Sequence, residues 1–212
     1  MGKNLILTSG SISRDSIIAS YRNVGYETSY LHSNYEPFNS VDDVIMGNLN
    51  NDKQVRISET RFKKQGTEGS AVLFSGLFIE TTLNTNTRSD IRLISNKVEL
   101  LRLDNCTEFK TNNLSFEKEF NVYTDNPTIT AKILTSAVME KLILLRTEYG
   151  MNYDFVIKGN KLYIRLVTGA LFETALQRST LNKEDLLIYY SILNYVDLLI
   201  TEIDKIIDAS NI

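Results

Sequence analysis

The sequence predicts an α+β protein: mainly antiparallel sheet(s) packed with an N-terminal helix, a central helical segment, a β-hairpin and a long C-terminal helix. Three observations support this. The most apolar β-prone run, residues 71–83, has the content of a strand covered on both faces. Strand-like runs come first and helical runs follow, which is typical of α+β folds. Gly159-Asn160 separates two alternating runs, which indicates a hairpin.

The central run contains one glycine, Gly76. Glycine weakens a strand unless a bulge, a bend or a close backbone approach requires it. We therefore expect one of these three features at Gly76.

The amino-terminal third predicts one helix and several strands. Residues up to about Ser13 read as a loosely held lead-in, and Ser13 can cap a helix that ends at Gly25. Residues 26–31 are a strand candidate. The other predicted segments are a turn with Pro37 over 33–40, an ambiguous strand or helix over 41–49, a turn over 48–52, a strand over 53–64 with Val55, Ile57 and Phe62 facing inward, and a hairpin loop over 65–69.

The middle of the chain changes from strands to helices. A polar loop is expected over 84–90, short strands over 91–95 and 97–103, an irregular polar stretch over 104–115, and one helical turn with a strand-like end over 116–123. Asp125 or Asn126 can cap a short helix that has Pro127 in its first turn and runs to Leu134. A second helix, capped by Thr135 or Ser136, is expected to run to Tyr149 and end at Gly150.

The carboxyl-terminal part predicts the hairpin, with strands over 153–158 and 161–167, and then a long helix that opens at residues 182–185. Its helical spacing comes from Leu186, Tyr190, Leu193, Val196, Ile200, Ile203 and Ile207. The run 186–200 is shorter than a membrane span of about 20 residues and contains Asn194 and Asp197, so we expect a core helix and no transmembrane segment. We expect a single domain over residues 1–212, with two subdomains, about 14–104 and about 114–212, as the alternative.

Composition argues against a nucleic-acid-binding protein, since the net charge is −3 and the pI is near 5.3. The run 61–64, Arg-Phe-Lys-Lys, is the one short basic candidate, and a solvated edge strand explains it more simply. The start of the chain lacks the pattern of a signal peptide, and a lone cysteine, Cys106, excludes an internal disulfide. We expect a cytoplasmic protein.

No catalytic, cofactor-binding or metal-binding residues are predicted. His32 is the only histidine, and its surroundings do not suggest that it pairs with Cys106 as base and nucleophile. No glycine-rich phosphate loop is present. Asp42-Asp43 reads as a solvated turn, and Glu117 with Glu119 as an exposed face above two phenylalanines. A ligand-facing patch could be formed by Tyr21, Tyr26, Tyr30 and Tyr35. The simpler interpretation is that these tyrosines lie at the rim of the core or anchor loops.

Several segments, in the same order, resemble a bacterial family known as domain of unknown function 3137. They are Leu-Phe-Ser-Gly-Leu-Phe at 73–78, residues 116–125, 131–135 and 139–142, and Gly-Asn-Lys-Leu-Tyr-Ile at 159–164; Tyr35 and residues 42–47 resemble its upstream half. The resemblance covers roughly Ser16 to the end. Where the family often has proline, this chain has Ser136. The resemblance implies no activity and no catalytic residues, but it implies that many relatives are anchored in a membrane.

The leading hypothesis is therefore a non-enzymatic, cytoplasmic binding or scaffold module that acts near the inner face of the membrane through a protein partner, with a membrane protein as one candidate. The oligomeric state is left open. A lipid- or small-ligand-binding domain is the alternative. An enzyme that uses scattered carboxylates or tyrosines comes third, and nucleic-acid binding comes last.

Overall fold

A computed structural model describes residues 4–7, 14–26, 40–49, 53–66, 69–95, 103–169, 171 and 183–210. The strands are β1 (Asn4–Leu7), β2 (Ser40–Asn48), β3 (Gln54–Gly66), β4 (Gly69–Thr82), β5 (Asp90–Ser95), β6 (Thr107–Glu108), β7 (Phe120–Thr124), β8 (Tyr153–Lys158) and β9 (Lys161–Val167). The helices are α1 (Arg14–Asn23), α2 (Leu114–Glu117), α3 (Pro127–Ile133), α4 (Ser136–Tyr149) and α6 (Lys183–Ala209). The protein is α+β, as predicted.

The strands form one antiparallel sheet in the order β1-β2-β3-β4-β9-β8-β5-β7-β6. The hairpin β8–β9 lies between β4 and β5, so strands from both halves of the sequence alternate in a single sheet. The single sheet therefore contains strands from both of the ranges considered as subdomains, about 14–104 and about 114–212.

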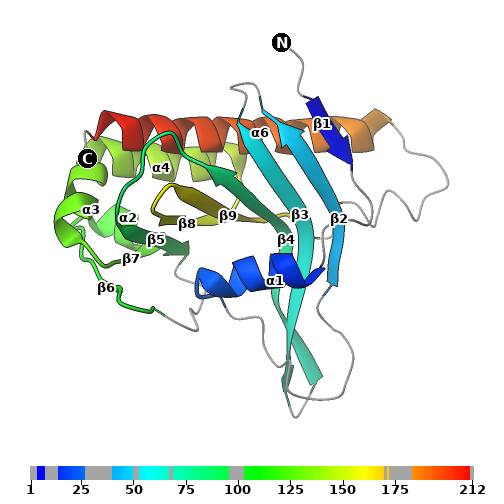
Figure 1. The fold of residues 1–212 in the computed structure, drawn as a ribbon, viewed down its shortest axis with the longest axis horizontal. Coiled ribbons are helices and arrows are strands. Elements are labelled where there is room, and N and C mark those ends of the chain that lie inside the picture. Colours follow the sequence, from blue (N-terminus) through cyan, green and yellow to red (C-terminus); the bar gives the residue numbers. More distant parts are fainter. Residues whose placement is uncertain are drawn as a thin grey trace.

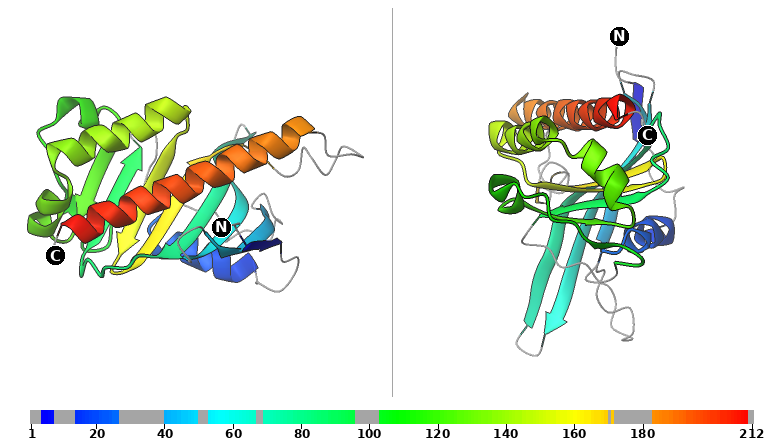
Figure 2. Two further views of the ribbon diagram at one scale, coloured as in Figure 1. Left: turned by 90° about the horizontal axis from the view of Figure 1, so that it is seen from above. Right: turned by 90° about the vertical axis from the view of Figure 1, so that its left-hand side faces the viewer.

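Helices cover both faces of this sheet (Figure 1, Figure 2). α4 and α6 lie on one face and α1 lies on the other. Each face has its own apolar core, because alternate side chains of a strand point to opposite faces. On β4, Leu77 and Ile79 join the core under α6, whereas Phe74 and Phe78 join the core under α1. Residues 71–82 of the run predicted to be covered on both faces belong to β4, whose side chains contribute to both cores.

Gly76 allows a close approach between β4 and β9. A Cβ atom at this position would overlap the carbonyl oxygen of Leu166 and would lie 2.8 Å from the backbone nitrogen of Thr168. Of the three features expected at Gly76, the structure shows the close backbone approach.

The predicted ends of α3 and α4 are confirmed. Asn126 caps α3 by accepting from the Ile129 N–H, and Thr135 caps α4 by accepting from the Val138 N–H. Gly150 ends α4 in the left-handed region, with φ of 61°. The hairpin turn at Gly159-Asn160 is also present, between β8 and β9.

Three expectations need correction. The lead-in before Ser13 contains strand β1, which pairs with β2 from Asn4↔Asn48 to Leu7↔Ile45. Its four residues are too few for their own sequence to predict a strand; pairing with β2 decides it. Of residues 41–49, which the sequence leaves between strand and helix, 41–48 belong to β2.

The third correction concerns the basic run 61–64. Arg61 does not lie at an edge, because it pairs with Ser40 of β2 and Ser75 of β4, and Phe62 is fully buried in the core under α1. Lys63 and Lys64 pair with Val72 and Ala71 of β4. Most of the strand candidates at 26–31 and 97–103, and the turn around Pro37, lie outside the described residues.

Candidate functional site

The amino-terminal end of α6 carries large apolar side chains in solvent. Leu186, Leu187, Ile188 and Tyr190, which we call the α6 collar, are each between 51% and 64% exposed. Figure 2 shows this end of α6 extending past the sheet that its other end covers. Leu186 and Tyr190 were expected to continue the core stripe of this helix, and that expectation is wrong.

The rest of α6 is firmly packed. Its buried side chains are Ile192, Tyr195, Val196, Leu199, Ile200, Ile203 and Ile207. Polar contacts fix the same half: Asp204 forms an ion pair of 2.9 Å with Lys53 and accepts from the backbone N–H of Asn84, also at 2.9 Å. The contrast between the two ends identifies the collar as an apolar surface that the rest of the protein does not cover.

Glu202 anchors α6 to α4. It pairs with Lys141 of α4 and with Lys205, the latter at 3.0 Å. The hydrogen bond from Lys141 lowers the pKa of the Glu202 carboxyl below its ordinary value. The charged form of Glu202 therefore stabilises the contact between α4 and α6.

A polar tether reaches the amino-terminal half of α6. The Tyr189 hydroxyl donates to the Leu171 carbonyl oxygen at 2.9 Å, and the Leu171 N–H donates to the buried Glu59 carboxylate of β3 at 2.7 Å. Tyr189 thus fixes one side of the helix while the collar residues remain in solvent.

By length and composition, one described helix segment, Leu186–Ala209, could cross a membrane; 44% of its most apolar window is buried in the protein. The ion pairs of Glu202 and Asp204 lie within this segment. The two carboxylates are buried and pair with Lys53, next to β3, and with Lys141 of α4, which favours the role of a core helix.

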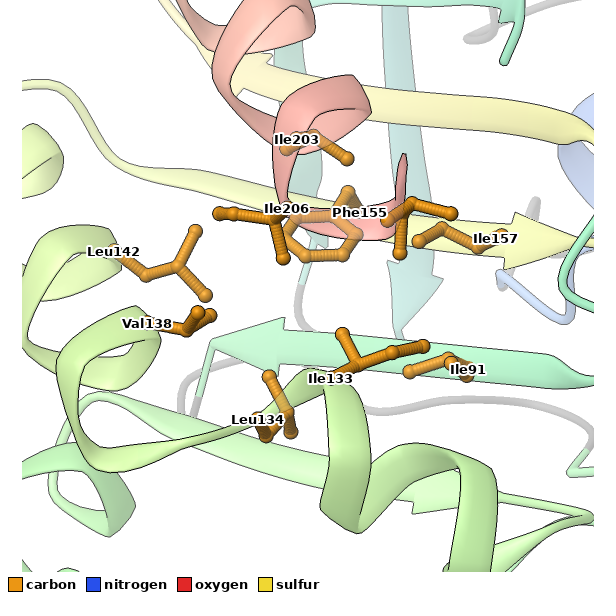
Figure 3. Close-up of a pocket in the computed structure, with 10 residues that line it drawn as sticks. Ile91, Ile133, Leu134, Val138, Leu142, Phe155, Ile157, Ile203 and Ile206 are labelled. Atoms are coloured by element: carbon orange, nitrogen blue, oxygen red, sulfur yellow. The ribbon is translucent and has the colours of Figure 1, made fainter. Parts of the chain in front are cut away.

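An apolar cavity lies between α3, α4, α6 and the sheet (Figure 3). It is lined by Ile91, Ile133, Leu134, Val138, Leu142, Phe155, Ile157, Ile203, Ile206 and Ile207, and its volume is about 10 Å³. Small-molecule pockets usually measure about 300–1,000 Å³. This cavity has room for about one water molecule, so it is far too small to hold a lipid.

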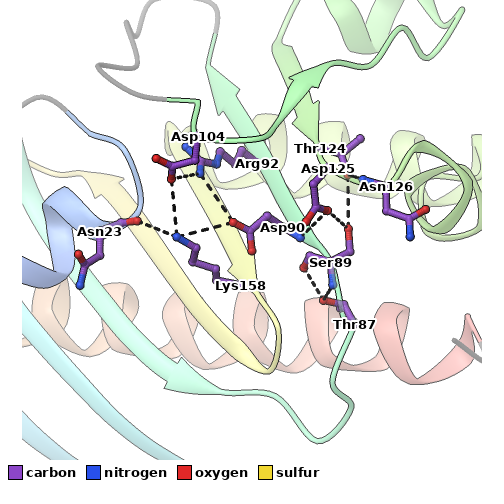
Figure 4. A network of polar contacts seen from close by, with 10 residues as sticks. All are labelled: Asn23, Thr87, Ser89, Asp90, Arg92, Asp104, Thr124, Asp125, Asn126 and Lys158. Atoms are coloured by element: carbon purple, nitrogen blue, oxygen red, sulfur yellow. Dashed lines mark hydrogen bonds and ion pairs between the residues drawn. The ribbon is translucent and has the colours of Figure 1, made fainter.

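A polar network joins the loops at one end of the sheet (Figure 4). Lys158 lies 3.7 Å from both Asp90 and Asp104, and Arg92, fully buried, pairs with Asp104 at 2.9 Å. Burial raises the pKa of Asp90, an effect that Lys158 partly offsets. The carboxylates converge on cations of the same chain, which gives the network a structural role.

Cys106 lies beside this network and is buried. Burial raises the pKa of its thiol, which Arg92 partly offsets, so the thiol is a poor nucleophile at neutral pH. His32 lies outside the described residues. Within the part of the chain that the structure describes, no group of three or more His, Cys, Asp and Glu side chains could hold a metal ion.

The other polar candidates are distributed as follows. Asp42 and Asp43 lie on β2, not in a turn. Glu117 accepts from Thr111 and Asn112, and Phe116 and Phe120 are buried beneath it as expected. Tyr21, on α1, and Tyr26, which follows α1, are buried in the core between α1 and the sheet, and Tyr30 and Tyr35 lie outside the described residues.

Sequence reasoning missed a buried ion pair under α1. Arg165 of β9 and Asp154 of β8 are 4% and 2% exposed and pair directly. The one signal was a charged residue at an alternate position of each hairpin strand, which on a two-sided sheet points into the second core.

Comparisons with known proteins give a family but no activity. Among curated proteins, none matches this sequence. One solved structure with a related chain path is the crystal structure of the mycobacterial trehalose monomycolate transport factor A, TtfA, at 9% identity and a TM-score of 0.46, over 76% of this chain and 73% of that chain. A likeness at this level gives no basis for transferring a function. The family model "Protein of unknown function (DUF3137)" matches residues 72–205, most of the chain, and the protein therefore belongs to this family.

Proposed function

We propose that the protein is a non-enzymatic binding module that docks onto a protein partner through the α6 collar. The observation that carries the proposal is the exposure of four large apolar side chains, at 51–64%, on a helix whose other half is buried. Exposed apolar surface of this kind commonly marks an interaction site.

The arrangement of the collar indicates what would cover it. Leu186 and Tyr190 are four residues apart and share one side of the helix, with Leu187 next to them. Ile188 lies roughly 200° around the helix axis from Leu186. Because apolar side chains lie on opposite sides, a partner that encloses the helix in a groove would bury more of them than a flat surface would.

The first turn of α6 argues for a protein groove over direct insertion into lipid. Lys183 and Glu184 precede the collar and are exposed. If the helix entered a bilayer end-on, these charges would lie deepest, which costs several kcal/mol per charge. A groove that is open at its end leaves them in water.

We also propose that the partner is a membrane protein and that the module acts at the cytoplasmic face of the membrane. The support is the resemblance to a family whose relatives are commonly membrane-anchored. The lipid-binding alternative would need a larger apolar cavity than the one of about 10 Å³ between α3, α4 and α6. A larger cleft, of about 240 Å³, has Arg56, Glu80 and Lys161 in its lining, so it suits a small polar ligand better than a lipid. An enzyme of the third kind would need carboxylates that are free to react. Asp90 and Asp104 are instead each paired with Lys158.

The test is a pull-down from detergent-solubilised lysate of the source organism with three tagged chains. They are the unmodified protein, the double variant Leu186→Glu/Tyr190→Glu, and the control Leu144→Glu. Leu144 is a matched control because it is an exposed leucine, 58%, on a different helix, α4. We expect a stoichiometric membrane protein with the unmodified chain and the control, and its loss with the double variant.

Two results would contradict this proposal. One is recovery of the same proteins by all three chains. The other is sedimentation of the purified protein with phosphatidylcholine vesicles that is abolished in the double variant, because the collar would then bind lipid directly.

A further inference from the structure

A polar cleft lies beside α1, on the face of the sheet that α1 partly covers. Its volume is about 240 Å³, and side chains of β2, β3, β4 and β9 line it. Arg56, in this lining, donates to the Ser16 and Ser20 hydroxyls of α1 at 3.3 and 3.2 Å. The apolar core under α1 begins two residues further along the strands, where Ser58 pairs with Phe78. The cleft is therefore next to this core and not part of it.

Strand pairing brings the lining residues together. Met46 of β2 pairs with Arg56 of β3, Arg56 pairs with Glu80 of β4, and Glu80 pairs with Tyr163 of β9. A second row lies two positions along the strands, points to the same face and is exposed: Gln54, Thr82 and Lys161. Because the second row is exposed, the cleft opens to solvent.

The cleft contains one balanced ion pair and one further positive charge. Arg56 pairs with Glu80, and their side chains are only 19% and 14% exposed. The Lys161 ammonium donates to the Thr82 hydroxyl at 2.9 Å. Among the residues that the structure describes, Lys161 has no carboxylate partner. Two cations and one carboxylate in the lining leave one positive charge.

Other cations on this face of the sheet differ from Lys161. Four of them form ion pairs with carboxylates of the same chain: Arg56, Arg92, Lys158 and Arg165. The charge of Lys161 is not balanced in this way, and it lies in a concave site. A cleft lined by one sign of charge concentrates ligands of the opposite sign, because its low-dielectric walls focus the field. The charge distribution therefore favours an anionic ligand.

The lining also provides an apolar surface and a hydroxyl donor. Met46 is partly buried, and the Tyr163 ring is stacked with Phe78 at 6.2 Å between centroids. Burial raises the pKa of the Tyr163 hydroxyl above its ordinary value, and the charge of Glu80 adds to this effect, so the hydroxyl stays protonated. The volume is below the about 300–1,000 Å³ of pockets for drug-sized ligands, so the ligand is a smaller molecule.

We propose that this cleft binds a small organic carboxylate with an apolar body. The Lys161 ammonium has three N–H donors, of which Thr82 accepts one, and the others bind the ligand carboxylate. Met46 and the Tyr163 ring contact the apolar body. The cleft lies on the face of the sheet opposite α6, so the proposal does not depend on the function proposed for the α6 collar.

The test is an NMR titration of the isotope-labelled full chain with benzoate at constant ionic strength. Benzamide has the same ring without the charge, and acetate has the charge without the ring. We expect benzoate to shift the amide signals of Gln54, Arg56, Thr82 and Lys161 to saturation, and benzamide and acetate to bind at least tenfold more weakly. Shifts that do not saturate, or benzamide binding as tightly as benzoate, would overturn the proposal.

Two lysine variants separate the cleft from a general effect of charge. Lys161→Gln should weaken benzoate binding at least tenfold, because it removes the cation that holds the carboxylate. Lys132→Gln is the matched control, since Lys132 is an exposed lysine on α3, and it should leave the affinity unchanged. Amide spectra that match the unmodified chain away from the cleft show that both variants fold. Equal benzoate affinity in Lys161→Gln, or an equal loss in Lys132→Gln, would contradict the assignment.

Discussion

The two halves of α6 are similar in composition and opposite in environment. The carboxyl-terminal half buries Val196, Ile200 and Ile203, whereas the amino-terminal half exposes Leu187 and Tyr190. Both halves have enough apolar residues to look like core. The difference is that the helix, 27 residues and about 40 Å long, extends past the sheet that covers its other end. Helical periodicity therefore predicts a buried face only where a partner surface is present.

The sharpest way to test this comparison is to truncate one side chain in each half. Ile200→Ala should lower the free energy of unfolding by about 2–5 kcal/mol, because it leaves a cavity in a packed core. Leu187→Ala should change it by less than about 0.5 kcal/mol, because the side chain is already in solvent. Urea denaturation followed by circular dichroism measures both. Similar losses for the two variants would show that the collar is packed in solution.

A second prediction concerns the sheet beneath the buried half. Gly76→Val should destabilise the protein by about 1–3 kcal/mol, since the new Cβ would overlap the Leu166 carbonyl oxygen and push β4 away from β9. Gly169→Ala is a useful control, because a Cβ there meets no atom within 4 Å, although its φ of 72° adds some strain of its own. If thermal unfolding showed equal melting temperatures for Gly76→Val and the unmodified protein, the close approach of β4 and β9 would not be needed for stability.

A third prediction concerns the tether of the exposed half. Tyr189→Phe removes the hydrogen bond to the Leu171 carbonyl oxygen and should cost about 0.5–1.5 kcal/mol. Hydrogen exchange should show faster exchange in the first turns of α6 and no change in its last turns. Uniform acceleration along the whole helix would mean that the two halves unfold as one unit.

The smallest expected effect is on pH dependence. The Glu202 pKa is lowered in the folded protein, chiefly by the hydrogen bond from Lys141, so the carboxylate contributes stability above its unfolded pKa, near 4.3. That contribution is lost as the pH falls through the lower folded pKa. Glu202→Gln should therefore flatten the loss of stability below about pH 5, measured by urea titrations at several pH values. An unchanged slope would indicate that the pair between α4 and α6 adds nothing.

Local signals predicted most elements because each depends on a few neighbouring residues. Asn126, Thr135 and Gly150 stand at the ends of α3 and α4 for reasons visible in the sequence: cap side chains accept from free N–H groups, and glycine adopts the left-handed region. The apolar, β-branched content of residues 71–83 likewise predicted a strand with two covered faces. These features need no knowledge of distant segments.

The candidate surfaces depended on distant pairings and were not predictable in the same way. β1 is a strand only because β2 lies beside it, and Arg165 is buried only because α1 covers that face of the sheet. The α6 collar is exposed only because the sheet ends before the helix does. The sequence by itself determined the α+β class, the helix caps, the hairpin and the central strand through local propensity; the tertiary structure decided which apolar and charged side chains are covered, because burial depends on what packs against a face.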